Sequence, residues 1–501
     1  MDAMTRYQNR ILLVEPPFYR LYKNNFSHSR YPLSLGYLAG VIKKKTKWEV
    51  MTYNPDFIAD NEGSSFSYVM GSGFENYING LKDFTRPVWK EVKSTISAFK
   101  PTIVGISAKS QNFISACIIA KFAKEFSKDS LVIVGGPHPS MVGSEVLMSP
   151  DIDVCVKGEG ENTIVELLEA INSQSSFKDI QGIIYRKNGE IIENPPREFI
   201  KDLDSLPFPH ESAPEVLKDY DQYPKTAFKH IFSTRGCPYN CFYCGSRKIW
   251  SRKVRFRSPE NVVREIKGLQ NIGLKSVNFE DDTFGVTKQH IKDLCHAIKK
   301  DCSGLKWSCE IPVKLVDEDV ISTMRRSGCY SIHIGVESGN NEMLKKIRKD
   351  ITIDEAFSAA KIIKKYGIEL NTFFMAGFPE ETEETLNDTM KAIEMIKSDQ
   401  VVYSIFTPYP GTEAFEFCKE NGLIDDYYNV SLYNHSSPAN CFCMNMDRKR
   451  FRVLASQIEK AVVRKNKHNL IRRIFSLNTF WRIQELGIVD SFKTFMNVIK
   501  S

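Results

Sequence analysis

The 501-residue sequence lacks any apolar run long enough to cross a membrane. A membrane-spanning helix needs roughly 18 or more consecutive apolar residues. The first residues, MDAMTRYQNR, run directly into ILLVEPPF and contain no apolar segment followed by a small-residue cleavage site. We therefore predict no secretory signal and a cytoplasmic protein, a compartment in which cysteines stay reduced.

A strong excess of one charge is also missing. The chain has 68 Lys and Arg against 61 Asp and Glu, a net charge of +7. This balance does not indicate a nucleic-acid partner. A hydrophobic share of 42% and a charged share of 26% are ordinary for a globular protein. The length exceeds what one hydrophobic core usually fills, so two or three domains are expected.

Short apolar runs alternate with helical segments over residues 1–175. Strands are expected at 11–14, 48–53, 102–107, 131–134 and 154–157. Continuous apolar strands separated by helices predict a parallel sheet covered on both faces, which is a doubly wound domain. Residues 176–225 look like a linker, with a hairpin near 183–192 and prolines at 195, 196, 207 and 209.

The alternation restarts near residue 231. Strands are expected at 231–234, 276–280, 305–309, 331–336, 369–375 and 401–406, with amphipathic helices between them. Six such units over residues 226–430 predict a partial (β/α)6 barrel. In parallel barrels the chemistry lies where the strands end.

Three of the twelve cysteines fall in one loop, STRGCPYNCFYC, as Cys237, Cys241 and Cys244. Thiolates are ligands of iron–sulfur clusters and of zinc. A structural zinc site usually takes four protein ligands, and no second cysteine pair follows at a finger-like spacing. Three thiolates on a four-iron cluster leave one iron open to an exogenous ligand. The other nine cysteines are read as small buried side chains.

This loop, with Tyr243 before the third cysteine, resembles the signature of the radical S-adenosylmethionine (SAM) superfamily. The resemblance implies a 4Fe–4S cluster whose open iron binds SAM, with Tyr243 among the cofactor-binding residues. It also implies that one electron, from a reductant of the flavodoxin or ferredoxin type, cleaves SAM to methionine and a 5′-deoxyadenosyl radical. A non-catalytic iron–sulfur or zinc protein is the alternative from another class.

Further motifs follow at later strand ends. After the second strand, FEDDTF places Asp281 and Asp282 where the superfamily holds the SAM ammonium group, although the usual glycine pair is absent. Carboxylate oxygens suit that group. A helix cap made by Asp282 or Thr283 is the structural alternative.

The fourth and fifth strands end in segments that resemble other SAM contacts. Glu337 and Ser338 match the segment that meets the SAM ribose or carboxylate. Gly377 and Glu380, in MAGFPEET, match the adenine-side segment. Proline- and glycine-rich segments of this kind can also be simple turns.

The first domain resembles the cobalamin-binding domain attached to many radical SAM enzymes. Doubly wound sheets bind ligands at the carboxyl ends of their strands. Ser107, Gly135 and Gly136 match small residues that line the path of the corrin's nucleotide tail, and Gly158 and Glu159 begin a motif found in the radical SAM relatives. No G-x-G-x-x-G opens the first helix, which argues against a nicotinamide cofactor. A Rossmann-like scaffold without a ligand is the alternative.

One expected histidine is missing. Related domains carry an Asp-x-His-x-x-Gly loop after the first strand, but here residues 15–20 read EPPFYR, and His28 lies further on. The resemblance then implies a corrin without a protein axial ligand. His138, after the glycine pair, is interpreted as a loop hydrogen-bonding residue rather than a cobalt ligand.

The C-terminal region, 431–501, is basic. Ten Lys and Arg fall between Arg448 and Arg473, against one acidic residue, Glu459. Apolar residues recur at helical spacing, and aromatics follow at Phe475, Phe480 and Trp481. A helix packed on the barrel with a solvated basic face is favoured. Peripheral membrane contact, with a lipid-like substrate, is the alternative.

The resemblance predicts an enzyme that abstracts hydrogen from an unactivated carbon of a small-molecule or lipid-like substrate and methylates it with cobalamin as methyl carrier. The second hypothesis keeps both cofactors but transfers no methyl group, as in an oxidative cyclase. The substrate and catalytic residues beyond cofactor binding are not predicted.

Overall fold

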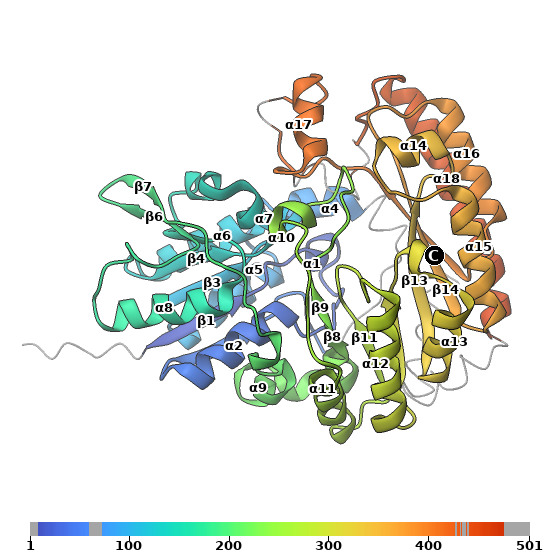
Figure 1. Cartoon of the computed structure of the whole chain (residues 1–501). Coiled ribbons are helices and arrows are strands. Elements are labelled where there is room, and N and C mark those ends of the chain that lie inside the picture. The colour runs from blue at the N-terminus through green and yellow to red at the C-terminus, as the bar shows by residue number, and fades with distance from the viewer. Residues whose placement is uncertain are drawn as a thin grey trace, which may run out of the picture. The chain divides into compact units, whose positions relative to one another are not determined.

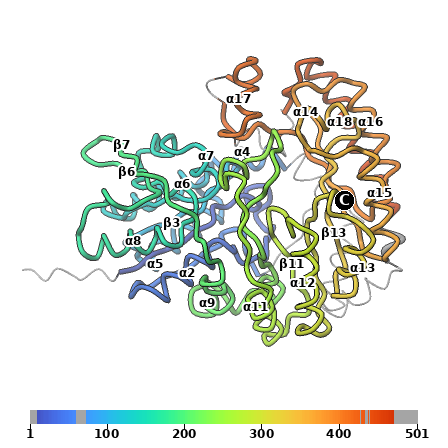
Figure 2. The backbone as a smooth tube through the Cα atoms, in the orientation of Figure 1, coloured from blue at the N-terminus to red at the C-terminus, as the bar shows by residue number. Residues whose placement is uncertain are grey.

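The computed structural model describes residues 9–59, 73–425, 428–430, 432, 437 and 440–474. The chain divides into two compact units, with the boundary between Phe228 and Lys229. Figure 1 shows the elements of each unit, and Figure 2 follows the same chain path as a tube. Each unit is described by itself.

The first unit contains a seven-stranded sheet in the order β2-β1-β3-β4-β5-β6-β7. The strands are β1 (Arg10–Val14), β2 (Glu49–Tyr53), β3 (Ile103–Ser107), β4 (Leu131–Gly135), β5 (Val154–Val156), β6 (Ile183–Lys187) and β7 (Glu190–Glu193). β1 to β5 pair in parallel, whereas β6 and β7 add an antiparallel hairpin at the β5 edge. The segment 176–225 thus contributes strands to this sheet.

The helices of this unit are α1 (Tyr19–Tyr22), α2 (Leu33–Lys45), α4 (Gly73–Gly80), α5 (Pro87–Phe99), α6 (Phe113–Phe126), α7 (Pro137–Val142), α8 (Gly160–Asn172) and α9 (Pro209–Val216). Those up to α7 connect the parallel strands, whereas α8 leads from β5 into the antiparallel hairpin and α9 follows it. The central strands β1 and β3 are buried along almost their whole length, because both faces of the sheet are covered. The predicted doubly wound architecture is confirmed.

The second unit contains a six-stranded parallel sheet in the order β15-β14-β13-β12-β11-β8. The strands are β8 (His230–Ile231), β11 (Ser276–Phe279), β12 (Lys306–Glu310), β13 (Cys329–Glu337), β14 (Glu369–Ala376) and β15 (Gln400–Ile405). A short antiparallel pair, β9 (Thr234–Arg235) with β10 (Arg255–Phe256), brackets the cysteine loop. The predicted partial (β/α)6 barrel is confirmed.

Five helices alternate with these strands: α11 (Pro259–Asn271), α12 (Lys288–Asp301), α13 (Glu318–Arg326), α15 (Ile353–Lys365) and α16 (Glu383–Met395). Each begins at a residue whose side chain accepts a hydrogen bond from the first turn: Ser258, Thr287, Asp317, Thr352 and Thr382. Shorter helices are α10 (Ser246–Trp250), α14 (Asn341–Lys346) and α17 (Glu413–Glu420).

The basic helix α18 (Arg448–Ile474) packs on α16 and on the edge strand β15. Figure 1 shows α18 beside α16. Asn466 bonds both the N–H and the carbonyl of Val401, at 2.8 Å each, and so closes part of that strand edge. Lys465 Nζ donates to the carbonyls of Ile393 and Ile396 at the end of α16. This confirms the favoured interpretation for the described part of the helix.

The basic face of α18 is partly paired. Arg450 and Arg464 form ion pairs with Glu383 and Glu394 of α16. The predicted aromatics at 475, 480 and 481 lie outside the described residues. In the described part of the chain, no helix combines the length and the apolar character needed to span a membrane.

Candidate functional site

Asp281 fixes the start of the cysteine loop. Its carboxylate accepts hydrogen bonds from the backbone N–H of Ser233 and Thr234 and from the Ser233 hydroxyl, each at 2.7 Å. Asp281 is buried, and burial raises its pKa to about 6, although these hydrogen bonds act in the opposite direction. With both oxygens engaged, Asp281 holds the loop and does not line the cavity described below.

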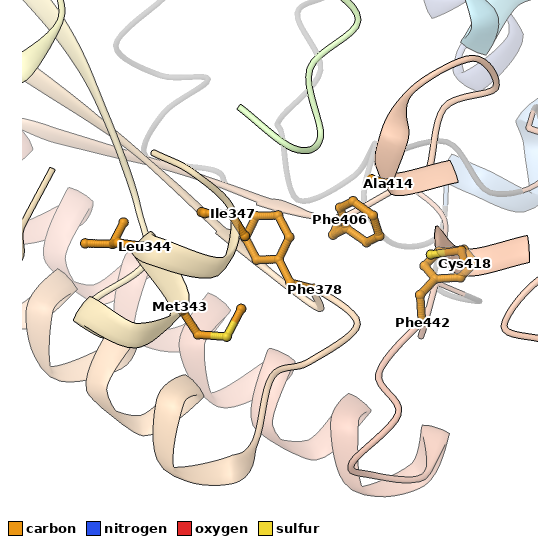
Figure 3. Packing of buried hydrophobic residues seen from close by; sticks show 8 residues of the cluster. All are labelled: Met343, Leu344, Ile347, Phe378, Phe406, Ala414, Cys418 and Phe442. Carbon is orange, nitrogen blue, oxygen red and sulfur yellow. The ribbon is translucent and has the colours of Figure 1, made fainter. Parts of the chain in front are cut away.

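The two aromatic residues between the second and third cysteines anchor the other end of the motif. Phe242 and Tyr243 pack against a buried cluster of Met343, Leu344, Ile347, Phe378, Phe406, Ala414, Cys418 and Phe442, shown in Figure 3. The Phe242 N–H also donates to the Ile347 carbonyl at 3.0 Å, and its carbonyl accepts from the Ala414 N–H at 3.2 Å. The loop is therefore held by packing and by backbone hydrogen bonds, independently of any ligand.

A cavity of about 350 Å³ opens beside this loop, within the second unit. All three cysteines line it, with Tyr243 and Asp282. The polar wall is completed by Glu310, Lys314, Glu337, Lys349 and Asp350, and the apolar wall includes Val313, Phe373, Phe374, Met375 and Val402. Strands β12 to β15 and the loops at their carboxyl ends supply most of this lining, as expected for a parallel barrel.

The donor set fits a four-iron cluster. Burial raises the pKa of Cys237 to about 12 and that of Cys244 to about 11, and electrostatic repulsion from the neighbouring thiols acts in the same direction. Bound iron would instead lower the pKa of these cysteines, because metals bind the thiolate. No group of three or more His, Cys, Asp or Glu among the described residues converges on one ion-sized point. The three thiols thus share a cavity without forming a single-ion site.

Glu337 and Lys349 form an ion pair in the cavity, with Nζ 2.8 Å from Oε1. Burial by itself lowers the pKa of Lys349, but Glu337 and Cys241 outweigh burial and raise it. A bulge in the β13–β14 register lies between Gly335 and Glu337, and Glu337 has a φ of 70°. Bulges re-aim side chains, and a positive φ in a non-glycine residue stores strain. The strained turn directs Glu337 toward the cavity.

Gly335 lies directly against this ion pair. A Cβ at that position would lie 2.4 Å from Glu337 Oε1 and 2.6 Å from Lys349 Nζ, so the ends of both side chains would have to shift. Gly335→Ala is therefore expected to displace the pair and weaken SAM binding by about tenfold or more, since charge-assisted contacts contribute roughly 1.5–3 kcal/mol. Equilibrium dialysis of the cluster-loaded protein with labelled SAM measures this.

Gly304→Ala is the matched control, because its added Cβ meets no atom within 4 Å, although its φ of 74° makes slight destabilisation expected. Unchanged SAM affinity in Gly335→Ala would show that the ion pair does not contribute to the site.

Three other predicted residues do not reach the cavity. Ser338 is fully buried, and its hydroxyl lies 3.3 Å from the Thr389 hydroxyl. Glu380 is partly exposed and pairs with Lys346 at 3.0 Å. The Gly377 N–H donates to Glu381 Oε2 at 2.5 Å, so the neighbouring carboxylate, which the sequence did not single out, holds this turn.

The first unit presents small residues at adjacent strand ends. Ser107 and Gly135 are register partners at the ends of β3 and β4. Gly136 has a φ of 108°, and a Cβ there would lie 2.8 Å from the Ala108 carbonyl oxygen, so glycine is required. No atom lies within 4 Å of where a Gly158 Cβ would be. This row of small residues fits a bulky ligand at the strand ends.

Two residues near this edge have structural partners. Glu159 is buried, and its Oε2 accepts from the Ile200 N–H at 2.7 Å, so it ties the following segment to the sheet. His138 is buried with Nδ1 3.0 Å from the Ser110 hydroxyl and its ring 4.3 Å from the Phe113 ring. The hydrogen bond agrees with the structural interpretation of His138, although the residue lies in α7 rather than in a loop.

The loop after β1 is held by Asp56, which accepts backbone hydrogen bonds from Phe18, Tyr19 and Arg20 at 2.9 to 3.1 Å. His28 stacks on Tyr19 with ring centroids 4.8 Å apart. The imidazole that lies nearest in the sequence to the missing position is thus engaged with an aromatic ring.

The first unit is a doubly wound domain with small residues at the ends of its strands. The second unit is a partial barrel whose cavity is lined by three thiols. These two features define the class of cobalamin-binding radical SAM enzymes. Residues 231–393 match the model of the Radical SAM superfamily, and residues 67–168 match that of the B12 binding domain. The chain is 31% identical over 425 residues to an uncharacterized methyltransferase of Pyrococcus horikoshii, covering 83% of this chain and 84% of that protein.

Two further comparisons agree. The anaerobic magnesium-protoporphyrin IX monomethyl ester cyclase of Rubrivivax gelatinosus is 29% identical over 70% of this chain and 63% of its own length. The radical SAM methyltransferase TsrM of Kitasatospora setae, solved with cobalamin and a [4Fe-4S] cluster, has the same fold, with a TM-score of 0.64 and 18% identity over 83% of this chain and 76% of that one.

The chain belongs to the cobalamin-dependent radical SAM methyltransferase family. It is an enzyme that uses a 4Fe–4S cluster, SAM and cobalamin, which confirms the three cofactors and the enzyme class predicted from the sequence.

Proposed function

We propose that this enzyme methylates an unactivated carbon of a small molecule. The observation that carries the proposal is one cavity in which three thiols, an ion pair and an apolar wall meet. When bound, the cluster supplies an electron, SAM the 5′-deoxyadenosyl radical, and cobalamin the methyl group. A hydrogen-abstracting radical needs a water-poor surrounding, and Phe373, Met375 and Val402 supply it.

In this proposal Cys237, Cys241 and Cys244 ligate the cluster. Asp282, which lines the cavity, accepts hydrogen bonds from the SAM ammonium group. Lys349 faces the SAM carboxylate and Glu337 the ribose, because the pair presents one cation and one acceptor beside the thiols. Tyr243 packs on the Phe378 ring, with centroids 5.6 Å apart, and forms the cavity wall at the cluster.

The corrin is proposed to lie along Ser107, Gly135, Gly136 and Gly158. The electron is proposed to come from a flavodoxin- or ferredoxin-type protein, because SAM cleavage consumes one electron from outside the enzyme. A lipid-like substrate and peripheral membrane contact by residues 431–501 stay predictions. For the described residues, the ion pairs between α18 and α16 support the favoured interpretation, in which this helix packs on the barrel.

The test uses anaerobically purified holoenzyme with dithionite and SAM carrying a deuterated methyl group, incubated with a metabolite extract of the source cells. We expect 5′-deoxyadenosine and a product that retains the deuterated methyl group, both measured by mass spectrometry. A product that has lost hydrogen without gaining that methyl group would contradict methylation and favour cyclisation, the activity named for the Rubrivivax relative.

A further inference from the structure

One carboxylate in the cavity has no partner. Among the cavity's charged side chains, Lys349 pairs with Glu337 at 2.8 Å and Lys314 with Asp350 at 2.6 Å. Asp282 accepts a hydrogen bond from the Gly236 N–H at 3.3 Å. Glu310, the last residue of β12, is exposed to the cavity, and its backbone carbonyl accepts from the Phe284 N–H, but no described residue donates a hydrogen bond or forms an ion pair with its carboxylate.

The surroundings of this carboxylate disfavour its negative charge. Although the side chain is open to the cavity, the protein packed around it raises the pKa of Glu310 to about 7, Lys349 acts in the opposite direction, and Glu337, Glu280 and Asp282 raise it further by repulsion. A cationic group entering the cavity would relieve this repulsion.

A second hydrogen-bond acceptor lies on the same face of the sheet as Glu310. Glu310 on β12 is the register partner of His333 on β13, which in turn is the partner of Asn371 on β14. Alternate residues of a strand share a face, so Asn371 lies on the face of Phe373 and Met375, both of which line the cavity. Asn371 is 7% exposed, and its Oδ1 accepts no hydrogen bond from the described residues.

The Asn371 amide nitrogen is already used. It lies 3.3 Å from the Ser331 hydroxyl and 3.1 Å from His333 Nε2. With that nitrogen donating, His333 accepts through Nε2 and is neutral, in agreement with burial lowering the pKa of His333. The side chains on this face therefore present acceptors, Glu310 first, next to an apolar wall.

We infer that Glu310 binds a cationic nitrogen group of the substrate, with Asn371 Oδ1 as a second acceptor deeper on the same face. The substrate class is then a small aliphatic amine or related cation whose apolar part contacts Phe373, Met375 and Val402. This inference rests on the proposed function and adds the chemistry by which its substrate is recognised. The SAM ammonium group is assigned to Asp282, one strand away, so Glu310 is left for the substrate.

The probe is n-hexylammonium, with n-hexanol as the neutral analogue of similar size, each titrated calorimetrically into anaerobic holoenzyme saturated with SAM. We expect hexylammonium to bind about 10- to 100-fold more tightly than hexanol, the range of a charge-assisted contact. Glu310→Gln, which keeps the shape, should remove this preference. Glu384→Gln, an exposed charge change on α16, should keep it.

Three further results separate the outcomes. Glu310→Lys should prefer hexanoate to hexylammonium, which tests the site by charge reversal. In Glu310→Gln the loss of hexylammonium binding should exceed any loss of SAM affinity; a larger loss of SAM affinity would make Glu310 a SAM ligand and overturn the inference. Equal binding of hexylammonium and hexanol to an enzyme that cleaves SAM would also overturn it, whereas an enzyme that does not cleave SAM would refute the proposed function itself.

Discussion

Replacing any one of Cys237, Cys241 and Cys244 by alanine is expected to reduce reductive SAM cleavage by roughly a thousandfold or more. Three thiolates are the fewest that hold a four-iron cluster while one iron stays open, so losing one removes the cluster or its redox function. The packing of Phe242 and Tyr243 should keep the loop folded in each variant. The measurement is 5′-deoxyadenosine formed with dithionite, together with iron bound per chain.

Cys302→Ala is the matched control. Cys302 is buried at the end of α12, and its side chain does not line the cavity. We expect this variant to keep its iron and its SAM cleavage, with only the modest loss of stability that follows from a small cavity. A cavity-cysteine variant that retained wild-type iron and wild-type cleavage would contradict the assignment of the triad.

The second large effect is expected at a buried ion pair behind the cysteine loop. Arg257 and Glu265 are each 2% exposed and lie 2.5 Å apart. The Arg257 guanidinium also donates to the Phe232 carbonyl at 2.7 Å and to Asn261 Oδ1 at 2.7 Å. The backbone N–H of Arg257 donates to the Ser233 carbonyl. The pair therefore connects α11 to the strand that leads into the cysteine motif.

Glu265→Ala should lower the free energy of unfolding of the barrel by about 3–5 kcal/mol, because it leaves a buried guanidinium without its counter-charge. The double variant Arg257→Met with Glu265→Leu should lose much less, since it removes both charges and keeps the volume. Thermal unfolding followed by calorimetry compares the two. A double variant as unstable as Glu265→Ala would show that the hydrogen bonds of Arg257, rather than charge pairing, stabilise this region.

Local patterns in the sequence were sufficient for the architecture. Apolar strands such as ILLV and IVGIS, and capped helices such as the one after Ser258, depend on neighbours in the chain, so periodicity and capping residues predict them. The cysteine spacing predicts a metal-binding loop for the same reason: all three proposed ligands lie within eight residues.

The direction of individual side chains could not be predicted in the same way. Asp281 and Asp282 are adjacent, yet one holds the loop and the other lines the cavity, which depends on where Ser233 and Thr234 lie in space. Likewise Glu381 rather than Glu380 turns toward Gly377. At the end of a strand, side chains no longer alternate strictly between the two faces of the sheet. The sequence therefore does not show which of two neighbouring carboxylates points into the cavity.

Lys349 and Glu310 were missed altogether. Lys349 reaches Glu337 across a separation of twelve residues. The residue with the strained backbone is Glu337 itself and not a glycine, so the sequence gives no sign of the bulge that redirects its side chain. Glu310 does carry a signal: it is a charged residue at the carboxyl end of the third barrel strand, WSCE, where barrel chemistry is expected. Reading every strand end for charge, rather than only those resembling known motifs, would have found it.

The central claim is that three thiols hold a four-iron cluster with one iron open to SAM. Mössbauer spectroscopy of protein reconstituted with ⁵⁷Fe tests it directly, with and without SAM. We expect cluster iron in which a single site changes its spectrum when SAM is added, and no such change in Cys241→Ala. A spectrum in which SAM alters none of the iron sites, or a loop that binds zinc in preference to iron, would contradict the account.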